Sequence, residues 1–139
     1  MAGSPCPTAT MRAVMDKLNM TEVTIGYGMT ETTVALAYGS GTLKLGSVGK
    51  LVPNIEARLV DPETGKDVTK QDAEGGTTGE LWVRGPSIVK GYYKNEKATR
   101  ETINEEGWLK TGDVVNIDKD GDLFIVDRLK ELIKVKGFQ

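Results

Sequence analysis

Apolar residues near the start of the chain follow the period of a helix. They recur at the i, i+3, i+4 and i+7 spacing that places side chains on one helix face, and prolines stand just before them. The apolar positions are Met11, Val14, Met15 and Leu18. The spacing predicts an amphipathic helix over residues 8–20. Residues 22–25 include β-branched side chains and predict a short buried strand that ends in the glycines of the next loop.

The middle of the chain changes to glycine-rich and alternating sequence. The glycines between residues 39 and 49 predict a loop. Residues 54–61, "NIEARLVD", then alternate with the period of a half-buried strand. The expected inward set is Ile55, Ala57 and Leu59, against Glu56, Arg58 and Val60. Residues 79–85, "GELWVRG", predict a second strand, and residues 87–93, "SIVKGYY", predict a third.

The last third of the chain predicts a short helix and a hairpin. Residues 95–103 have a pattern compatible with a helix that is covered on one face. Residues 114–117 and 123–126 predict two strands around "DKDGD", in which Asp120 and Gly121 are a strong tight-turn signal. Two helices among several antiparallel strands predict an α+β fold with a β-rich main part.

Composition excludes several kinds of chemistry. The chain has 139 residues, of which 38% are hydrophobic and 27% charged, and no apolar run approaches the roughly 18 residues of a membrane span. It has no histidine and one cysteine, Cys6, so neither a zinc site nor an imidazole-based triad is expected. A net charge of −2 with interspersed signs gives no footprint for nucleic acid. The sequence shows no secretory signal, so we expect an intracellular compartment, and it leaves the oligomeric state open.

Three stretches could carry chemistry, and each has an ordinary structural alternative. "GYGMTET", residues 26–32, places an aromatic ring, hydroxyls and a carboxylate between and after glycines, but such a loop could also simply turn a corner. "WLKTGD", residues 108–113, could be a capped turn that enters a strand. "DRLKELIKVKG", residues 127–137, could be a solvated basic face.

Taken in order, these stretches resemble a known series of motifs. "GYGMTET", "GELWVRGPSIVKGYY", "GWLKTGD" and "DRLKELIKVKGFQ" are similar in order and spacing to the core motifs of the AMP-forming adenylating enzymes. That superfamily includes acyl-CoA synthetases, coumarate:CoA ligases, firefly-type luciferases and the adenylation domains of peptide synthetases. The final stretch most resembles the coumarate:CoA ligase and medium-chain acyl-CoA synthetase branches.

The resemblance implies a division of the chain into three parts. Residues 1–36 would end the α/β layer of a large adenylating domain. Residues 37–126 would form its β-rich subdomain, a distorted antiparallel, barrel-like unit. Residues 127–139 would be the hinge that leads into a small carboxy-terminal domain. The chain is therefore expected to be an internal fragment of a longer enzyme.

The resemblance also implies roles for the first loop. Tyr27 would lie against the adenine ring, and Thr30 would donate its hydroxyl to the α-phosphate. Glu31 would hold Mg²⁺, a hard cation that prefers carboxylate and phosphate oxygens. The neighbouring Gly26, Gly28 and Met29 would complete this side of the nucleotide site, because glycines let the backbone approach the ligand closely.

Roles are implied for the later motifs as well. Asp113 would accept hydrogen bonds from the two ribose hydroxyls, and Arg128 would contact ribose and phosphate oxygens with its planar fork. Lys130 would lie at the pivot of the small domain, and Gln139 would contact the adenylate. Lys134 would serve the second half reaction, so the implied catalytic residues are Thr30, Glu31 and Lys134.

The implied reaction has two steps. A small-molecule carboxylic acid, fatty or phenylpropanoid, is activated with ATP to an acyl-adenylate, and the acyl group passes to coenzyme A. The family's phosphate loop and its carboxy-terminal lysine have no match here, so we expect the chain alone to be inactive. The alternative is a non-catalytic module that binds adenine nucleotides or a partner. The expected location is the cytoplasm or the peroxisome.

Overall fold

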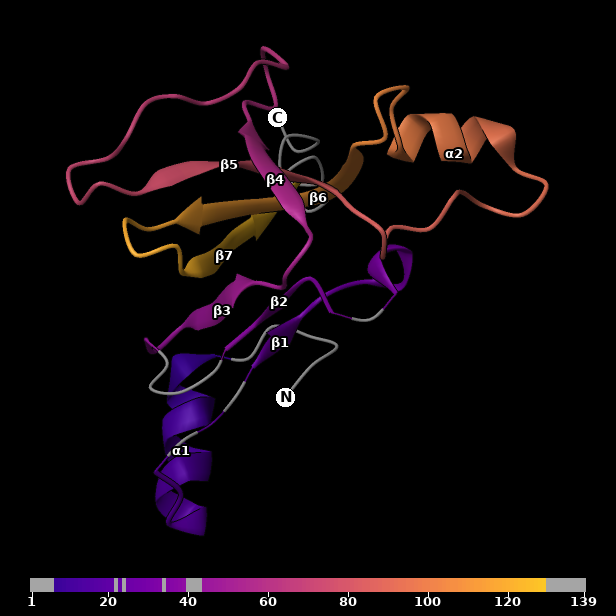
Figure 1. Ribbon diagram of the computed structural model, residues 1–139. Helices are drawn as coiled ribbons and strands as arrows, with labels where there is room; N and C mark the ends of the chain where they lie inside the picture. The colour runs from indigo at the N-terminus through magenta and orange to yellow at the C-terminus, as the bar shows by residue number, and fades with distance from the viewer. Residues whose placement is uncertain (1–6, 22, 24, 34, 40–43, 130–139) are drawn as a thin grey trace, which may run out of the picture.

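The computed structural model describes residues 7–129 apart from residues 22, 24, 34 and 40–43. Over these residues the chain forms two α-helices, one 3-10 helix and seven strands (Figure 1). In chain order they are α1 (Thr8–Leu18), β1 (Gly26–Tyr27), η1 (Thr30–Thr32), β2 (Ala37–Tyr38), β3 (Ser47–Leu51), β4 (Glu56–Val60), β5 (Thr77–Arg84), α2 (Glu96–Thr102), β6 (Leu109–Ile117) and β7 (Leu123–Arg128). No helix among the described residues is both long and apolar enough to cross a bilayer.

The strands form one antiparallel sheet in the order β1-β2-β3-β7-β6-β5-β4. In Figure 1, α1 extends away from the β1–β3 end of the sheet and α2 lies to one side of it. This arrangement confirms the predicted α+β class with a β-rich, antiparallel main part. The pairing of β1 with β2 carries the sheet across residue 36, where the sequence predicts a boundary, and the three-part division of the chain stays a prediction.

Both predicted helices are present. α1 ends at Leu18 because Asn19 takes a left-handed conformation (φ 49) and its N–H bonds back to the last turn. α2 begins after Asn95, whose side-chain oxygen accepts a hydrogen bond of 3.1 Å from the Ala98 N–H. Local capping therefore sets the helix limits within two residues of the predicted ones.

Two predictions near the start are wrong: the position of one strand and the extent of one loop. Val23 and Ile25 lie outside any strand, and β1 forms just after them, with Tyr27 opposite Ala37 of β2. The glycine-rich stretch predicted as a loop contains β3. Gly49 of β3 has φ +88, and a Cβ there would lie 2.3 Å from the Tyr38 carbonyl carbon. Glycine is thus what lets β3 approach β2, rather than a sign of a loop.

Two further predictions fail because the chain finds other partners. Residues 87–93 form no strand, since the Val89 N–H bonds to the Glu31 carbonyl at 2.9 Å instead of to a neighbouring strand. Val60, expected on the outward face of β4, is 1% exposed. The chain folds back over Val60, which pairs with Asp67 in an isolated bridge. The rest of β4, β5 and the β6–β7 hairpin are confirmed.

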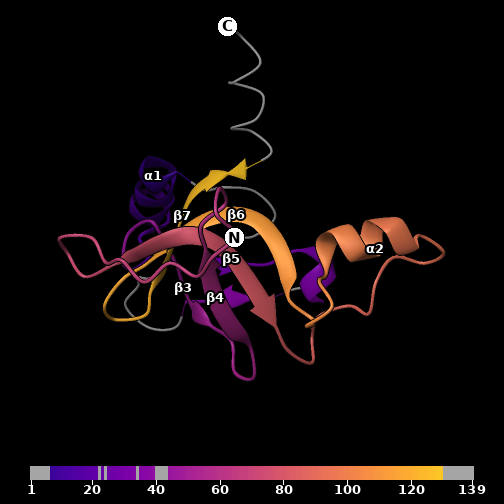
Figure 2. The same ribbon diagram turned by 90° about the horizontal axis from the view of Figure 1, so that it is seen from above.

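The densest packing lies around β6, between β5 and β7. Apolar side chains from these three strands are 0 or 1% exposed: Leu81, Val83, Leu109, Val115 and Leu123. Burying one such side chain contributes about 1.5–3 kcal/mol. β6 curves strongly as it crosses this core (Figure 2). The curvature matters because β6 carries a buried acidic residue.

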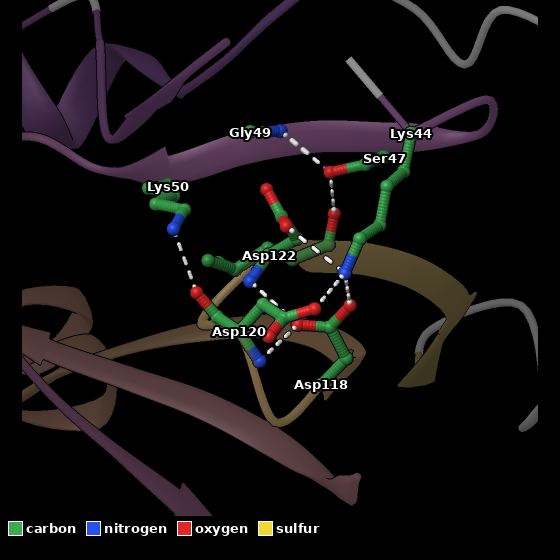
Figure 3. A network of polar contacts seen from close by, with 8 residues as sticks. Lys44, Ser47, Gly49, Lys50, Asp118, Asp120 and Asp122 are labelled. Atoms are coloured by element: carbon green, nitrogen blue, oxygen red, sulfur yellow. Dashed lines mark hydrogen bonds and ion pairs between the residues drawn. The ribbon is translucent and has the colours of Figure 1, made fainter. Parts of the chain in front are cut away.

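An ionic cluster ties the β6–β7 turn to the start of β3 (Figure 3). Lys44 Nζ lies 2.5 Å from Asp118, 2.6 Å from Asp120 and 3.3 Å from Asp122. The hydrogen bond from Lys44 lowers the pKa of Asp118 to about 2. Asp118 also accepts hydrogen bonds from the Asp120 and Asp122 N–H groups. One lysine is therefore shared by three carboxylates and offsets part of the negative charge of the turn.

Candidate functional site

Asp113 is the last residue of one irregularity of β6 and lies next to a second. In the pairing of β6 with β5, Val114 lies opposite Glu80 and Lys110 lies opposite Trp82. The three residues 111–113 of β6 therefore face the single residue Leu81 of β5. The register with β7 shifts again between Val114 and Val115. Such bulges bend a strand and redirect side chains, and they recur beside functional sites. The sequence "TGD" is therefore a bulge within a strand, rather than the turn that precedes one.

Hydrogen bonds fix the bulge. The Thr111 hydroxyl donates to the Leu81 carbonyl at 2.7 Å and accepts from the Asp113 N–H at 3.1 Å. Gly112 takes φ +72, and its N–H donates to Glu80 Oε1 at 3.3 Å. Thr111 and Glu80 are each 8% exposed. These two buried side chains hold the backbone N–H groups of Gly112 and Asp113 and so orient Asp113. Sequence reasoning missed both as parts of the site.

The Asp113 carboxylate receives donors from two other strands. Tyr27 Oη of β1 donates to Oδ2 at 2.6 Å, and Arg128 Nε of β7 donates to Oδ1 at 2.8 Å. Asp113 is 3% exposed, whereas the Arg128 side chain is 59% exposed. Burial, and then the hydrogen bond to Asp113, raises the pKa of the Tyr27 phenol. Tyr27 is therefore a protonated donor at neutral pH, and the structure brings three sequence-predicted residues into one network.

The first motif forms a compact loop around Thr32. The Thr32 hydroxyl accepts from the Met29 N–H at 3.1 Å and donates to the Met29 carbonyl at 2.9 Å, which closes η1. Thr32 is fully buried, while Thr30 is exposed and Glu31 is half-buried. Thr32 thus anchors the loop, and the two residues before it present a hydroxyl and a carboxylate.

The second motif docks against this loop. The Glu31 carbonyl accepts from the Val89 N–H at 2.9 Å, and the Thr33 hydroxyl donates to the Ser87 carbonyl at 2.7 Å. Tyr92 Oη donates to Glu31 Oε1 at 2.5 Å, which raises the pKa of the Tyr92 phenol. Sequence reasoning missed Tyr92. Its only signal is its place at the end of the second motif, "GPSIVKGYY".

The oxygen atoms of Thr30 and Glu31 could take part in binding a Mg²⁺ ion that is also held by phosphates. Among the described residues there is no group of three or more acidic, cysteine or histidine side chains that could enclose an ion. Mg²⁺ commonly takes only one or two protein carboxylates and completes its shell with phosphate oxygens and water. Glu31 beside the exposed Thr30 hydroxyl suits that mode, with the phosphates coming from a nucleotide.

The remaining predicted residues are placed as follows. Gly26 belongs to β1, and Gly28 is exposed at the start of the loop that leads to Met29 and η1. Lys130, Lys134 and Gln139 lie outside the described residues. Two surface hollows lie elsewhere, one at α2 and the other beside Asp72 and Asp118.

Comparison with known proteins identifies the family. The model of the AMP-binding enzyme family matches residues 1–93, which is more than half of the chain. The chain belongs to the AMP-binding enzyme family. Its membership confirms the resemblance that the ordered motifs indicate.

Relatives within the AMP-binding family are acyl-CoA ligases. The chain is 46% identical over 143 residues to "4-coumarate--CoA ligase-like 4" of Oryza sativa subsp. japonica, covering 99% of this chain and 24% of that protein. It is 44% identical over 141 residues to "Peroxisomal OPC-8:0-CoA ligase 1" of Arabidopsis thaliana, covering 99% of this chain and 25% of that protein. The chain thus spans about a quarter of the length of the curated relatives it matches.

Solved structures of the family share the fold. The ATP-bound MatB of Rhodopseudomonas palustris matches with a TM-score of 0.78 and 32% identity, over 91% of this chain and 24% of that one. The anthranilate CoA ligase AuaEII in complex with anthranoyl-AMP matches with a TM-score of 0.78 and 29% identity, over 91% and 23%. Both likenesses cover nearly all of this chain.

Proposed function

We propose that this chain forms the adenine- and ribose-binding part of an acid–thiol ligase. The ligase would activate a carboxylic acid with ATP and transfer the acyl group to coenzyme A. The observation that carries the proposal is the convergence of Tyr27, Asp113 and Arg128, which come from three strands and three family motifs. Membership of a family whose relatives are CoA ligases supports the reaction class.

The Asp113 carboxylate has the acceptor capacity that a ribose requires. A carboxylate offers about four lone-pair sites, and Tyr27 and Arg128 each occupy one, on different oxygens. One site on each oxygen is left for the two ribose hydroxyls. Because Asp113 is 3% exposed, the ribose would approach along the exposed Arg128 side chain, which keeps its Nε bonded to Oδ1. In that position Arg128 can contact ribose or phosphate oxygens.

The first loop would bind the rest of the nucleotide. We assign the Tyr27 ring to the adenine face, the backbone of Gly26, Gly28 and Met29 to close approach, and the Thr30 hydroxyl to the α-phosphate. Glu31 would hold Mg²⁺, which neutralises phosphate charge when it is bound. The loop thereby binds and orients the nucleotide, and it supplies no covalent intermediate.

The reaction itself is a substitution at phosphorus followed by one at carbon. A carboxylate oxygen of the acid attacks the α-phosphorus, and the bond to the β-phosphate breaks to release pyrophosphate. The coenzyme A sulfur then attacks the acyl carbon, and AMP leaves. We propose that Lys130 lies at the pivot of the small domain, that Lys134 serves the second step, and that Gln139 contacts the adenylate. The division into residues 1–36, 37–126 and 127–139 is proposed with them.

The alternative is a module that binds adenine nucleotides without turnover. The groups gathered at Asp113 are binding groups, which favours this alternative for the isolated chain. In that case a pyrophosphate-release assay with ATP, Mg²⁺ and a panel of fatty and aromatic acids gives no turnover. We propose a cytoplasmic or peroxisomal location, and the relative named Peroxisomal OPC-8:0-CoA ligase 1 supports the latter.

Calorimetric binding of AMP tests the site. The wild-type chain should bind AMP more tightly than 2′,3′-dideoxy-AMP, because a hydrogen bond to a charged group contributes about 1.5–3 kcal/mol. Asp113→Asn should lose that preference, with a smaller effect on the dideoxy analogue. Equal preference in the wild type and in Asp113→Asn removes Asp113 from the ribose site.

A further inference from the structure

We infer that Tyr92 is a positioning residue for Glu31. Its hydroxyl holds one carboxylate oxygen and leaves the other available as a ligand for a metal ion that would bind together with the nucleotide phosphates. The inference rests on the proposed function, in which Glu31 holds Mg²⁺. It adds a residue from the second motif to the metal-binding part of the site.

The hydrogen bond itself is short and joins distant parts of the chain. Tyr92 Oη donates to Glu31 Oε1 at 2.5 Å across 61 positions of sequence. That distance is typical of a hydroxyl that donates to a charged carboxylate, at about 2.5–2.7 Å. Among the described residues Glu31 Oε2 accepts no hydrogen bond. One oxygen of Glu31 is therefore fixed and the other is free to act as a ligand.

The backbone of Glu31 is held by the same segment that carries Tyr92. Val89 donates its N–H to the Glu31 carbonyl, and the Thr33 hydroxyl donates to the Ser87 carbonyl. Figure 1 shows this segment leaving β5 and passing beside η1 on its way to α2. Because residues 87–92 contact both the backbone and the side chain of Glu31, they fix the direction of its carboxylate.

Tyr92 is fixed in turn against α2. Its N–H donates to the Thr99 hydroxyl at 2.9 Å, and that hydroxyl donates to the Asn95 carbonyl at 2.9 Å. Gly91 has φ +144, and a Cβ there would lie 2.6 Å from Thr99 Cγ2. Only glycine allows this close approach to the helix. The position of the phenol is thus set by α2 rather than by a free loop.

Hydrogen-bonding partners of metal-binding carboxylates commonly affect metal affinity by about 10–100-fold. The adjacent Tyr93 offers a matched control. It is 88% exposed, and its ring lies 5.2 Å from the Lys94 ammonium, without a hydrogen bond to Glu31. Replacing either tyrosine by phenylalanine removes one hydroxyl and keeps the ring, and only Tyr92→Phe removes a hydrogen bond to Glu31.

The test measures ATP binding to the chain by calorimetry, with Mg²⁺ and with EDTA. Tyr92→Phe should weaken the Mg²⁺-dependent gain in affinity by about 10-fold or more and leave binding in EDTA unchanged. Tyr93→Phe should change neither. In the Glu31→Gln background, adding Tyr92→Phe should have no further effect on the Mg²⁺ dependence.

Each contrary result identifies what fails. If Glu31→Gln lowers the Mg²⁺ gain and Tyr92→Phe does not, the inference about Tyr92 is wrong and the proposed function stands. If Tyr92→Phe weakens binding equally with Mg²⁺ and with EDTA, the hydroxyl is only structural and the inference is again wrong. If the wild type gains no affinity from Mg²⁺, or Glu31→Gln leaves the gain intact, the metal role of Glu31 in the proposed function fails together with the inference.

Discussion

Tyr27 and Asp113 stand 86 positions apart in the chain and are joined by a hydrogen bond of 2.6 Å. Tyr27 comes from β1 at one edge of the sheet, and Asp113 comes from the interior strand β6. The bond therefore links the first motif to the third. Its removal should have a measurable cost, since Asp113 is 3% exposed and water can replace the lost donor only poorly.

Tyr27→Phe should lower the free energy of unfolding by about 1–3 kcal/mol, the cost of leaving a buried polar group without a partner. The ring that is assigned to adenine stays in place. Urea denaturation followed by tryptophan fluorescence measures the loss. Tyr38→Phe is the control, because Tyr38 is 55% exposed and its loss of a hydroxyl should be nearly neutral. If Tyr27→Phe leaves the free energy of unfolding unchanged, the hydrogen bond to Asp113 does not stabilise the fold as predicted.

Thr111→Val should disturb the bulge that orients Asp113. The substitution keeps the shape of the side chain but removes the donor to Leu81 and the acceptor of the Asp113 N–H. We expect a loss of about 1–3 kcal/mol in stability, together with a reduced preference for AMP over its dideoxy analogue. Thr111→Ser retains the hydroxyl, so it should keep most of the stability and most of the preference for AMP. An unchanged nucleotide preference in Thr111→Val shows that the bulge does not position Asp113.

Gly49→Ala should destabilise the sheet much more than Gly65→Ala. Both glycines have positive φ, +88 and +67, but only at Gly49 would a Cβ meet backbone atoms, at 2.3 Å. Adverse backbone conformation costs about 1–3 kcal/mol and is common to both variants. Overpacking adds about 1–3 kcal/mol at Gly49 alone. Thermal melts of the two variants compare these costs. Similar melting temperatures would contradict the claim that β2 and β3 approach too closely at Gly49 for a side chain.

The Lys44 cluster should make stability depend on pH at the acid end. Lys44 holds the pKa of Asp118 at about 2, below the ordinary value of about 3.9 for aspartate. A carboxyl group whose pKa is lowered by folding contributes its stability above the unfolded pKa. That contribution is lost as the pH falls from about 4 through 2. The melting temperature should therefore drop over this interval.

Lys44→Met should flatten this pH dependence, because the largest cause of the lowered pKa is gone. Part of it should remain, since backbone N–H groups also lower the pKa of Asp61 and Asp72. Lys50→Met is the matched control: Lys50 Nζ donates to the Asp120 carbonyl, an uncharged group. If melting curves of Lys44→Met and Lys50→Met follow pH identically, the cluster does not act as described.

Local sequence was sufficient for elements whose signals lie within a few residues. The 3.6-residue period predicted α1, and Asn95 could cap α2 through its own side chain. The Asp120–Gly121 turn predicted the β6–β7 hairpin. The order of the motifs predicted the family, because motif chemistry is recorded in residue types and spacing.

The same local signals misassigned residues that depend on distant partners. Glycine at position 49 was taken for a loop residue, since only the approach of β2 shows why a side chain is forbidden there. Residues 87–93 have strand-forming composition, yet their backbone bonds to the Glu31 loop. Composition states what a segment can form, and the available hydrogen-bond partners decide what it does form.

By itself the sequence determined the family, the α+β class, and the chemical groups offered by Tyr27, Glu31, Asp113 and Arg128. Only the tertiary structure decided that β6 carries a bulge at "TGD", that Tyr27 donates to Asp113, and that Tyr92 contacts Glu31. The physical reason is that buried donors and acceptors must find partners in three dimensions. Those partners lie up to 86 positions away, where no local pattern can identify them.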